Sequence, residues 1–220
     1  AIAGRGEGVR PASSVGRLRG QLFGITGGIG SGKSLVCRIF QSMGVPVYSA
    51  DAEAKWLIGH DPEIKEGIVK IFGSGAYTPE GEYNRPYVAD LAFADASRLK
   101  ALNALVHPAV ERHSRAWHEV RAAAGYPYTL KEAALMIESG SHRFLDHLIV
   151  VTAPETLRIQ RVMQRDGLSG EQVRARMAGQ LPEADKIKLA YFVVENDGVR
   201  MLIPQIWSIH SALLQKAKTN

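Results

Sequence analysis

Several features that would place a chain in a special class are scarce in these 220 residues. No run of about 18 or more apolar residues occurs, so we expect neither a membrane-spanning helix nor a membrane partner. The single cysteine, Cys37, has no internal partner for a disulfide bond, which suits a reducing compartment. No internal repeat is present, and the length suffices for one α/β domain with small insertions. We therefore predict a single-domain, cytoplasmic protein.

Positive charge is also limited once its distribution is considered. The formal net charge is +5, but residues 1–20 contain four arginines and one glutamate, so the remaining chain carries only +2. Nucleic-acid-binding proteins usually present a dense basic stripe, and none is visible after residue 20. We expect no nucleic-acid partner, whereas a modest positive charge is compatible with a site for nucleotide phosphates.

The first twenty residues have a composition of their own. Residues 1–20 are rich in Gly, Arg and Ser and lack any apolar period, which predicts a disordered extension outside the folded domain of residues 21–220. The same Arg-rich, acid-poor composition is found in organelle transit peptides, and a leader foreign to the domain is an equal alternative.

Short apolar runs alternate with helical stretches from residue 21 onward. We predict strands at residues 21–26, 45–49, 133–137, 148–151 and 192–194. Strands separated by helices favour a parallel sheet with helices on both faces. Two stretches interrupt this alternation, namely the mostly helical residues 61–128 and the charged residues 167–190, which open with a capping-box pattern at Ser169 and Gln172.

A complete phosphate-binding motif follows the first predicted strand. Residues 27–34 read Gly-Gly-Ile-Gly-Ser-Gly-Lys-Ser and match G-x-x-x-x-G-K-[ST]. Glycines allow backbone N–H groups to turn toward phosphate oxygens, and the helix that follows directs its positive end at the same anion. Lys33 is expected to reach the β- and γ-phosphates of ATP, and the Ser34 hydroxyl to ligate Mg²⁺. The residues assigned to the nucleotide here are Gly28, Ile29, Gly30, Ser31, Gly32, Lys33, Ser34 and Leu35.

The motif alone leaves the class of nucleotide-binding protein open. Motors, GTPases, transporter subunits and kinases all use it. The absence of an N-K-x-D-like guanine signature counts against a GTPase.

Asp51 ends the second predicted strand. In doubly wound sheets ligands bind beyond the carboxyl ends of the strands, so Asp51 is expected in the same crevice as the phosphate motif. A carboxylate there can accept a hydroxyl proton, orient the acceptor or hold Mg²⁺ through water. The alternative is that Asp51 caps a helix starting at Ala52.

A stripe of arginines precedes the second charged stretch. Arg158, Arg161 and Arg165 share one face of the helix predicted at residues 154–165. Such a stripe is either a solvated face or part of a mobile lid that brings cations onto the transferring phosphate and excludes water.

Three further residues have positions of interest. Glu138 directly follows the predicted strand 133–137, which favours a place at the crevice floor. His107 and Arg85 lie in the helical stretch 61–128, where a lone histidine is more often structural than functional.

In order and spacing, these elements resemble the dephospho-CoA kinase family over about residues 22–198. The matching elements are 26–34 (T-G-G-I-G-S-G-K-S), Ser49-Ala50-Asp51, His107-Pro108, 135–138 (L-M-I-E), 161–166 (R-V-M-Q-R-D), 176–180 (R-M-A-G-Q) and Asn196-Asp197-Gly198. Each short element alone is weak evidence for the family, whereas their combination in this order and spacing is specific.

The resemblance implies an α/β fold of the P-loop NTPase type, in three layers with a five-stranded parallel sheet. It further implies a helical acceptor-binding insertion at about 61–128 and a helical lid at about 167–190. The implied reaction is transfer of the ATP γ-phosphoryl group to the ribose 3′-hydroxyl of dephospho-CoA, with Mg²⁺. Separately, we expect a monomer or small homo-oligomer.

By position in the family pattern, Asp51 becomes the base or acceptor-orienting carboxylate. The other residues carried over as catalytic are Lys33, Arg161 and Arg165. Asn196 and Gly198 are expected to border the adenine, and Arg85, His107 and Glu138 to line the acceptor side.

The chain departs from the family pattern at three positions. Ser49 replaces the first Asp of D-A-D, Leu35 replaces a common Thr, and Tyr191 replaces the Asp of an A-D pair. Ser49 and Tyr191 motivate one rival interpretation, an ATP-binding module without catalysis. The other rival is another small-metabolite or nucleoside monophosphate kinase, which the P-loop, the lid and Asp51 would serve equally.

Overall fold

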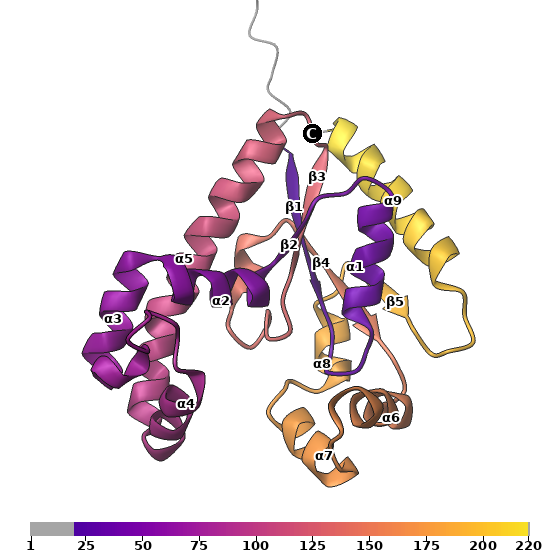
Figure 1. Ribbon diagram of the computed structural model, residues 1–220. Coiled ribbons are helices and arrows are strands. Elements are labelled where there is room, and N and C mark those ends of the chain that lie inside the picture. The colour runs from indigo at the N-terminus through magenta and orange to yellow at the C-terminus, as the bar shows by residue number, and fades with distance from the viewer. Residues whose placement is uncertain (1–19, 220) are drawn as a thin grey trace, which may run out of the picture.

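The computed structural model describes residues 20–219, and its centre is one parallel sheet (Figure 1). The described strands are β1 (Gln21–Thr26), β2 (Val47–Ser49), β3 (Tyr128–Glu132), β4 (His147–Thr152) and β5 (Phe192–Glu195). Their order is β2-β3-β1-β4-β5, and all four pairings are parallel. The sheet therefore grows to both sides of β1, the arrangement in which ligands bind beyond the carboxyl ends of the strands. The extension predicted at residues 1–20 lies, apart from Gly20, outside the described residues.

Each face of the sheet has its own hydrophobic core. On one face, α1 (Lys33–Ser42) and α9 (Leu202–Thr219) pack over Phe23 of β1 and Ile149 of β4. On the other face, α5 (Ala96–Ala123) covers Leu148 and Val150 of β4. Successive residues of β4 thus enter opposite cores, as expected for a strand buried on both faces. The fold confirms the predicted three-layer α/β architecture.

Cys37 belongs to the core beneath α1. Its side chain is buried, and this burial raises the pKa of the thiol to about 12. The group therefore stays a neutral thiol at physiological pH, and Cys37 serves as a small core residue.

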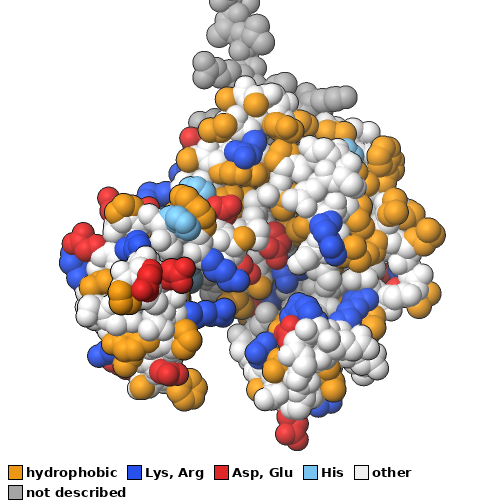
Figure 2. Space-filling model, viewed as in Figure 1, with side chains coloured by type: hydrophobic (Ala, Val, Ile, Leu, Met, Phe, Trp, Pro, Cys, Tyr) orange, Lys and Arg blue, Asp and Glu red, His pale blue; other side chains and the backbone are white. Residues whose placement is uncertain are grey.

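Two groups of helices extend beyond the carboxyl ends of the strands. The first, which we call the helical arm, consists of α2 (Ala50–His60), α3 (Pro62–Phe72), η1 (Ser74–Ala76), α4 (Arg85–Ala94) and the N-terminal half of α5. The second, the lid segment, consists of α7 (Gly170–Ala178) and α8 (Glu183–Lys188), and it follows α6 (Glu155–Asp166). Figure 2 shows a hollow between the two, with Lys and Arg side chains along its rim. None of the helices described between residues 20 and 219 is long and apolar enough to cross a membrane.

Two helix ends carry clear local signals. Ser169 and Gln172 form the predicted capping box at the start of α7. Gly44 follows α1 with a φ of 83°, a conformation that favours glycine.

The strand predicted at residues 133–137 is wrong. Strand β3 spans Tyr128–Glu132 instead, and residues 134–140 form turns. The charged pair Lys131 and Glu132 interrupts the apolar pattern on which the prediction depended, yet Lys131 is only 2% exposed. Its ammonium group pairs with Glu111 of α5, which permits a lysine in a buried strand. Glu138 consequently does not end a strand, whereas Glu132 does.

Candidate active site

The glycine-rich loop joins β1 to α1 in a conformation that requires glycine. Gly30 and Gly32 have φ values of 79° and 94°, which residues with a Cβ rarely adopt. A Cβ on Gly32 would also collide with the side-chain amide of Asn196. The Ser31 hydroxyl is buried at the base of the loop without a hydrogen-bond partner. The loop is thus built with its backbone close to β5 and its N–H groups at the N-terminus of α1, as anion binding requires.

Two predicted site residues support this loop from the neighbouring elements. Asn196 follows β5 and donates from Nδ2 to the Ser31 carbonyl at 2.8 Å. Arg161 of α6 donates to the carbonyl of Asn196 at 3.2 Å and to its Oδ1 atom at 3.3 Å. Gly198 lies two residues further on with a φ of 83°. The structure therefore brings Arg161 and Asn196 together beside the glycine-rich loop, and it shows no contact between Gly198 and that loop.

The three arginines on one face of α6 have different surroundings; those of Arg161 are given above. Arg158, buried to 7% exposure, donates from Nε to the Ile29 carbonyl at 3.0 Å and pairs with Glu183 of α8 at 3.0 Å. Arg165 is exposed and forms two hydrogen bonds with the carboxylate of Asp166, at 2.7 and 2.9 Å. Arg158, which the sequence left outside the site, joins the P-loop to α8, whereas Arg165 is not brought to the loop.

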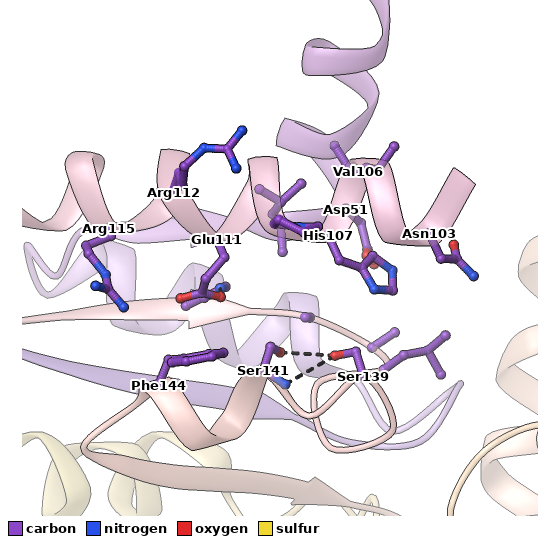
Figure 3. A pocket seen from close by; sticks show the side chains of 18 of the residues that line it. Asp51, Asn103, Val106, His107, Glu111, Arg112, Arg115, Ser139, Ser141 and Phe144 are labelled. Atoms are coloured by element: carbon purple, nitrogen blue, oxygen red, sulfur yellow. Dashed lines mark hydrogen bonds and ion pairs between the residues drawn. The ribbon is translucent and has the colours of Figure 1, made fainter. Parts of the chain in front are cut away.

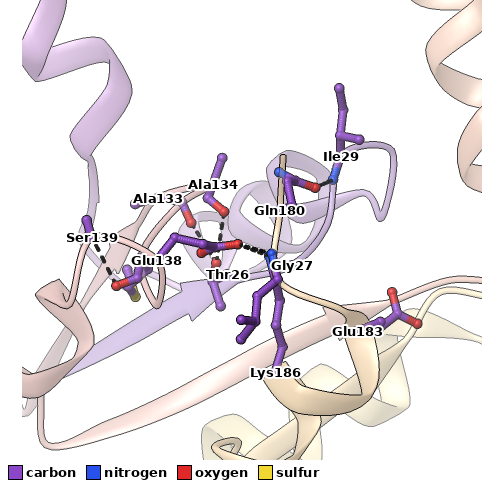
Figure 4. A network of polar contacts seen from close by, with 12 residues as sticks. Thr26, Gly27, Ile29, Ala133, Ala134, Glu138, Ser139, Gln180, Glu183 and Lys186 are labelled. Carbon is purple, nitrogen blue, oxygen red and sulfur yellow. Dashed lines mark hydrogen bonds and ion pairs between the residues drawn. The ribbon is translucent and has the colours of Figure 1, made fainter. Parts of the chain in front are cut away.

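The lid segment contacts the P-loop through a small polar network (Figure 4). The Ile29 N–H donates to the Gln180 side chain at 2.8 Å. Glu138 accepts a 2.9 Å hydrogen bond from the Leu181 N–H and forms a 2.8 Å ion pair with the buried Lys186 of α8. Glu138, which lies in the turns after β3, thus binds the lid segment through these two contacts. It is not among the residues that line the cavity described below.

Three charged groups gather at the carboxyl edge of the sheet, next to the P-loop. Lys33 donates to the Gly27 carbonyl at 3.2 Å, and Glu132 accepts a 3.3 Å hydrogen bond from the Ser49 hydroxyl. Asp51 lies in the first turn of α2, where an anion is favoured by the helix dipole. The N-cap of α2 is Ser49, so the alternative that Asp51 caps a helix starting at Ala52 is wrong.

These three groups influence one another electrostatically. Burial lowers the pKa of Lys33, and the charges of Glu132 and Asp51 oppose that shift. Burial likewise raises the pKa of Glu132, an effect that Asp51 strengthens while Lys33 and the Ser49 hydrogen bond oppose it. Ionisable groups whose pKa values are shifted by neighbouring charges, next to a cavity, are typical of catalytic centres.

Sequence reasoning missed Glu132. The available signal was the sequence Tyr-Thr-Leu at residues 128–130, good strand formers that end in a charged pair at the edge where ligands bind.

Asp51 is one of the residues that line a cavity of about 760 Å³ (Figure 3). Along α5, the lining residues Asn103, His107, Glu111 and Arg115 recur every fourth position, so they follow one face of the helix. The opposite wall comes from the turns after β3 and from the short 3-10 helix η2 (Ser141–Phe144), and it includes the residues Ala134, Leu135, Ser139, Ser141 and Phe144. Volume and mixed lining suit a ligand of the size of a nucleotide.

Of the residues predicted for the acceptor side, His107 lines the cavity and Arg85 does not. His107 lines the cavity together with Asp51. Arg85 is exposed at the start of α4 and is absent from the lining residues of the described chain.

The cavity wall contains the buried ion pair between Lys131 and Glu111, at 2.6 Å. We expect Glu111→Gln to lower the free energy of unfolding by roughly 3 kcal/mol, because it leaves a buried ammonium group without a counter-charge. Urea denaturation measures the effect. The exposed Glu119→Gln on the same helix is the control and should stay within about 0.5 kcal/mol of the wild type. Equal stability of the two variants would show that the ion pair is not needed.

A strand, a glycine loop and a helix that present Lys33 and Ser34, together with a carboxylate that faces a separate cavity, define a P-loop kinase for small molecules. The family model described as "Dephospho-CoA kinase" matches residues 21–201. The chain therefore belongs to the dephospho-CoA kinase family.

Individual relatives agree with this assignment. The dephospho-CoA kinase of Bacteroides fragilis strain YCH46 is 37% identical over 194 residues, covering 88% of this chain and 93% of the relative. That of Salinibacter ruber is 42% identical over 176 residues, covering 80% and 88%.

Solved structures support the same fold. TT1252 from Thermus thermophilus superposes with a TM-score of 0.74 at 36% identity, over 90% of this chain and 98% of that one. The dephospho-CoA kinase from Campylobacter jejuni gives 0.65 at 24% identity, over 89% and 98%. A shikimate kinase from Acinetobacter baumannii gives 0.50 at 15% identity over 90% and 94%, a likeness of fold alone.

Proposed function

We propose that this chain transfers the γ-phosphoryl group of ATP to the ribose 3′-hydroxyl of dephospho-CoA, giving coenzyme A and ADP. The observation that carries the proposal is the position of Asp51. Its carboxylate acts electrostatically on Lys33, and the same residue lines a cavity large enough for the nucleotide part of the acceptor. Membership of the dephospho-CoA kinase family supports the choice of acceptor.

On the nucleotide side, the backbone N–H groups of residues 28–35 and the N-terminus of α1 hold the phosphates, and Lys33 contacts the β- and γ-phosphates. Arg161 and Asn196 fix the loop by their hydrogen bonds, and Asn196 and Gly198 border the adenine. When ATP binds, the Ile29 N–H donates to a phosphate oxygen in place of the Gln180 side chain, and the lid segment moves as this hydrogen bond is lost. Arg165 reaches the phosphates only after it leaves Asp166.

On the acceptor side, Asp51 orients the ribose hydroxyl and accepts its proton during transfer. His107 donates or accepts a hydrogen bond from the wall formed by α5, and Arg115 on the same face offers a cation to the diphosphate of the acceptor. Arg85 requires a movement of α4 to contact the acceptor. We assign Glu138 to positioning of the lid segment, because of its contacts with Leu181 and Lys186.

The residues present fit a magnesium ion held mainly by the substrate. Ser34 is exposed in the first turn of α1, and the described residues contain no group of three or more His, Cys, Asp or Glu side chains placed to hold a metal. Mg²⁺ is commonly bound by one or two protein oxygens, phosphates and water. When bound, the ion neutralises charge on the β- and γ-phosphates.

Removal of divalent cations tests the magnesium requirement. We expect chelation by EDTA to abolish ADP release and added Mg²⁺ to restore it. Ser34→Ala should raise the Mg²⁺ concentration needed for half-maximal rate. Full activity in EDTA would contradict the assignment of Ser34.

The acceptor is tested by ADP release from ATP and Mg²⁺, with dephospho-CoA, adenosine monophosphate or shikimate as the second substrate. Strong stimulation by dephospho-CoA alone is expected. Stimulation by a control acceptor would make the chain a different small-molecule kinase, and no stimulation would favour an ATP-binding module. A cytoplasmic location, a monomeric or small homo-oligomeric state and the lack of a nucleic-acid partner stay predictions.

A further inference from the structure

The ammonium group of Lys186, on α8, is buried and only partly compensated. The side chain is 1% exposed, and its described ion pair is with Glu138, at 2.8 Å. The contact is close, yet the Nζ atom has no hydrogen-bond partner within the described chain. An ammonium group has three donors, and a buried cation is costly unless anions or acceptors surround it. Lys186 therefore has the capacity to bind a further anion.

The face of α8 that carries Lys186 is turned to the glycine-rich loop. Glu183 lies three residues earlier and thus on the same face of the helix. It pairs with Arg158, which in turn donates from Nε to the Ile29 carbonyl at 3.0 Å. Just before α8, the Gln180 side chain accepts a hydrogen bond from the Ile29 N–H. Contacts on both sides of Ile29 therefore hold α8 against the loop that binds phosphate.

Lys186 also lies near the second cation of this loop. Lys33 donates to the Gly27 carbonyl at 3.2 Å, and the Lys186 side chain runs from α8 towards Glu138 and Gly27 (Figure 4). The charge of Lys186 acts electrostatically on Lys33. Two ammonium groups at one end of the loop repel each other unless an anion lies between them. Because Lys33 is the group expected at the β- and γ-phosphates, the terminal phosphate of ATP is an anion that fits this place.

We propose that Lys186 is a further catalytic residue, whose ammonium group contacts the γ-phosphoryl group of ATP and stabilises it during transfer. Glu138 holds the ammonium group in place before ATP binds, and the space in front of it opens when Gln180 leaves the Ile29 N–H. A donor that is fixed in advance costs no reorganisation as charge develops in the transition state. The inference rests on the proposed function, because that function defines the group that is transferred.

Lys186 keeps its proton throughout this step. The bond between the γ-phosphorus and the bridging oxygen of ADP breaks while the bond to the ribose oxygen of the acceptor forms. The proton of the acceptor hydroxyl passes to Asp51, and the ammonium group of Lys186 supplies positive charge alone.

The decisive variant is Lys186→Met, which keeps most of the apolar length of the side chain but removes the charge. We expect the dissociation constant of ATP to rise about tenfold and kcat to fall about 10²-fold, the scale of a lost donor to a developing charge. ADP lacks the γ-phosphoryl group, so its dissociation constant should stay within about twofold of the wild type. Titration calorimetry and steady-state kinetics measure these quantities. Lys188→Met, which removes an exposed cation from the same helix, is the matched control and should behave as the wild type.

Glu138→Gln distinguishes a phosphate contact from a purely structural ion pair. The glutamine keeps an oxygen that accepts from the Leu181 N–H but no longer competes for the ammonium group. We expect this variant to bind ATP about threefold more tightly, because Lys186 is then free for the phosphate. If the pair served only to hold the lid segment, loss of either partner would weaken ATP binding. A loss of ATP affinity in both variants would therefore overturn the inference.

Two results with Lys186→Met alone would also overturn it. One is a wild-type affinity for ATP together with a wild-type kcat, and the other is an equal loss of ATP and ADP affinity with a lowered thermal midpoint. The titrations require no acceptor, so they test Lys186 independently of the proposed reaction. If the wild type releases no ADP with dephospho-CoA while the ATP affinities differ as expected, the proposed function fails and the contact of Lys186 with the γ-phosphate stands.

Discussion

Replacement of Asp51 by asparagine is expected to leave ATP binding nearly intact while kcat falls by about 10²-fold or more, the scale on which loss of a general base acts. Asp51 lines the cavity that we propose for the acceptor, and asparagine preserves its shape without the ability to take a proton. Steady-state kinetics with dephospho-CoA and titration calorimetry with ATP measure the two quantities separately.

A control is available on the same helix. Glu53 also lies in the first turn of α2, so Glu53→Gln removes a comparable interaction with the helix dipole without touching the cavity. This variant should keep its kcat. An unchanged kcat in Asp51→Asn would refute the assignment of Asp51 as the base.

Replacement of Lys33 by alanine is expected to weaken both ATP binding and transfer, with kcat lowered on the order of 10²- to 10³-fold. This is the effect of removing one preorganised donor from a developing charge. Lys33 begins α1 directly behind the glycine loop, and its ammonium group is held by the Gly27 carbonyl. Calorimetry gives the loss of ATP affinity, and single-turnover kinetics gives the loss in the transfer step.

Arg38→Ala is the matched control for Lys33→Ala, since it removes an exposed cation from the same helix. It should bind ATP as the wild type does. Near-normal turnover of Lys33→Ala would contradict the description of the loop as the phosphate site.

The nucleotide half of the site could be predicted from the sequence because its signals are local. Strand β1 has the predicted bounds, Gln21–Thr26, and the conformations of Gly30 and Gly32 follow from a motif of eight consecutive residues. The geometry of such a motif follows from local sequence, since the strand, the loop and the helix N-terminus are contiguous.

The remainder depends on contacts between distant residues. Lys131 can lie in a buried strand because Glu111, twenty positions earlier, compensates its charge. Neither the true position of β3 nor the place of Glu132 at the edge of the sheet follows from the apolar pattern. Likewise, only the fold separates Arg158 and Arg161, which contact the P-loop, from Arg165, which pairs with Asp166.

Two departures from the family pattern now have a physical account. Ser49 contributes a hydroxyl where the pattern has a carboxylate, and this hydroxyl donates to the carboxylate of Glu132, its partner in the register with β3. Tyr191 stacks on His147 with ring centroids 4.0 Å apart, and Lys216 lies 4.3 Å from the Tyr191 ring centroid. Tyr191 therefore packs against neighbouring side chains near the start of β5, and these contacts do not involve the P-loop.

The most direct test of the central claim is identification of the product by phosphorus NMR, after incubation with ATP, Mg²⁺ and dephospho-CoA. The account predicts one new phosphomonoester on the ribose 3′-oxygen, with the spectrum of authentic coenzyme A, formed in equal amount to ADP. ADP accompanied by inorganic phosphate and unchanged dephospho-CoA would contradict it, and so would a phosphomonoester on any other hydroxyl.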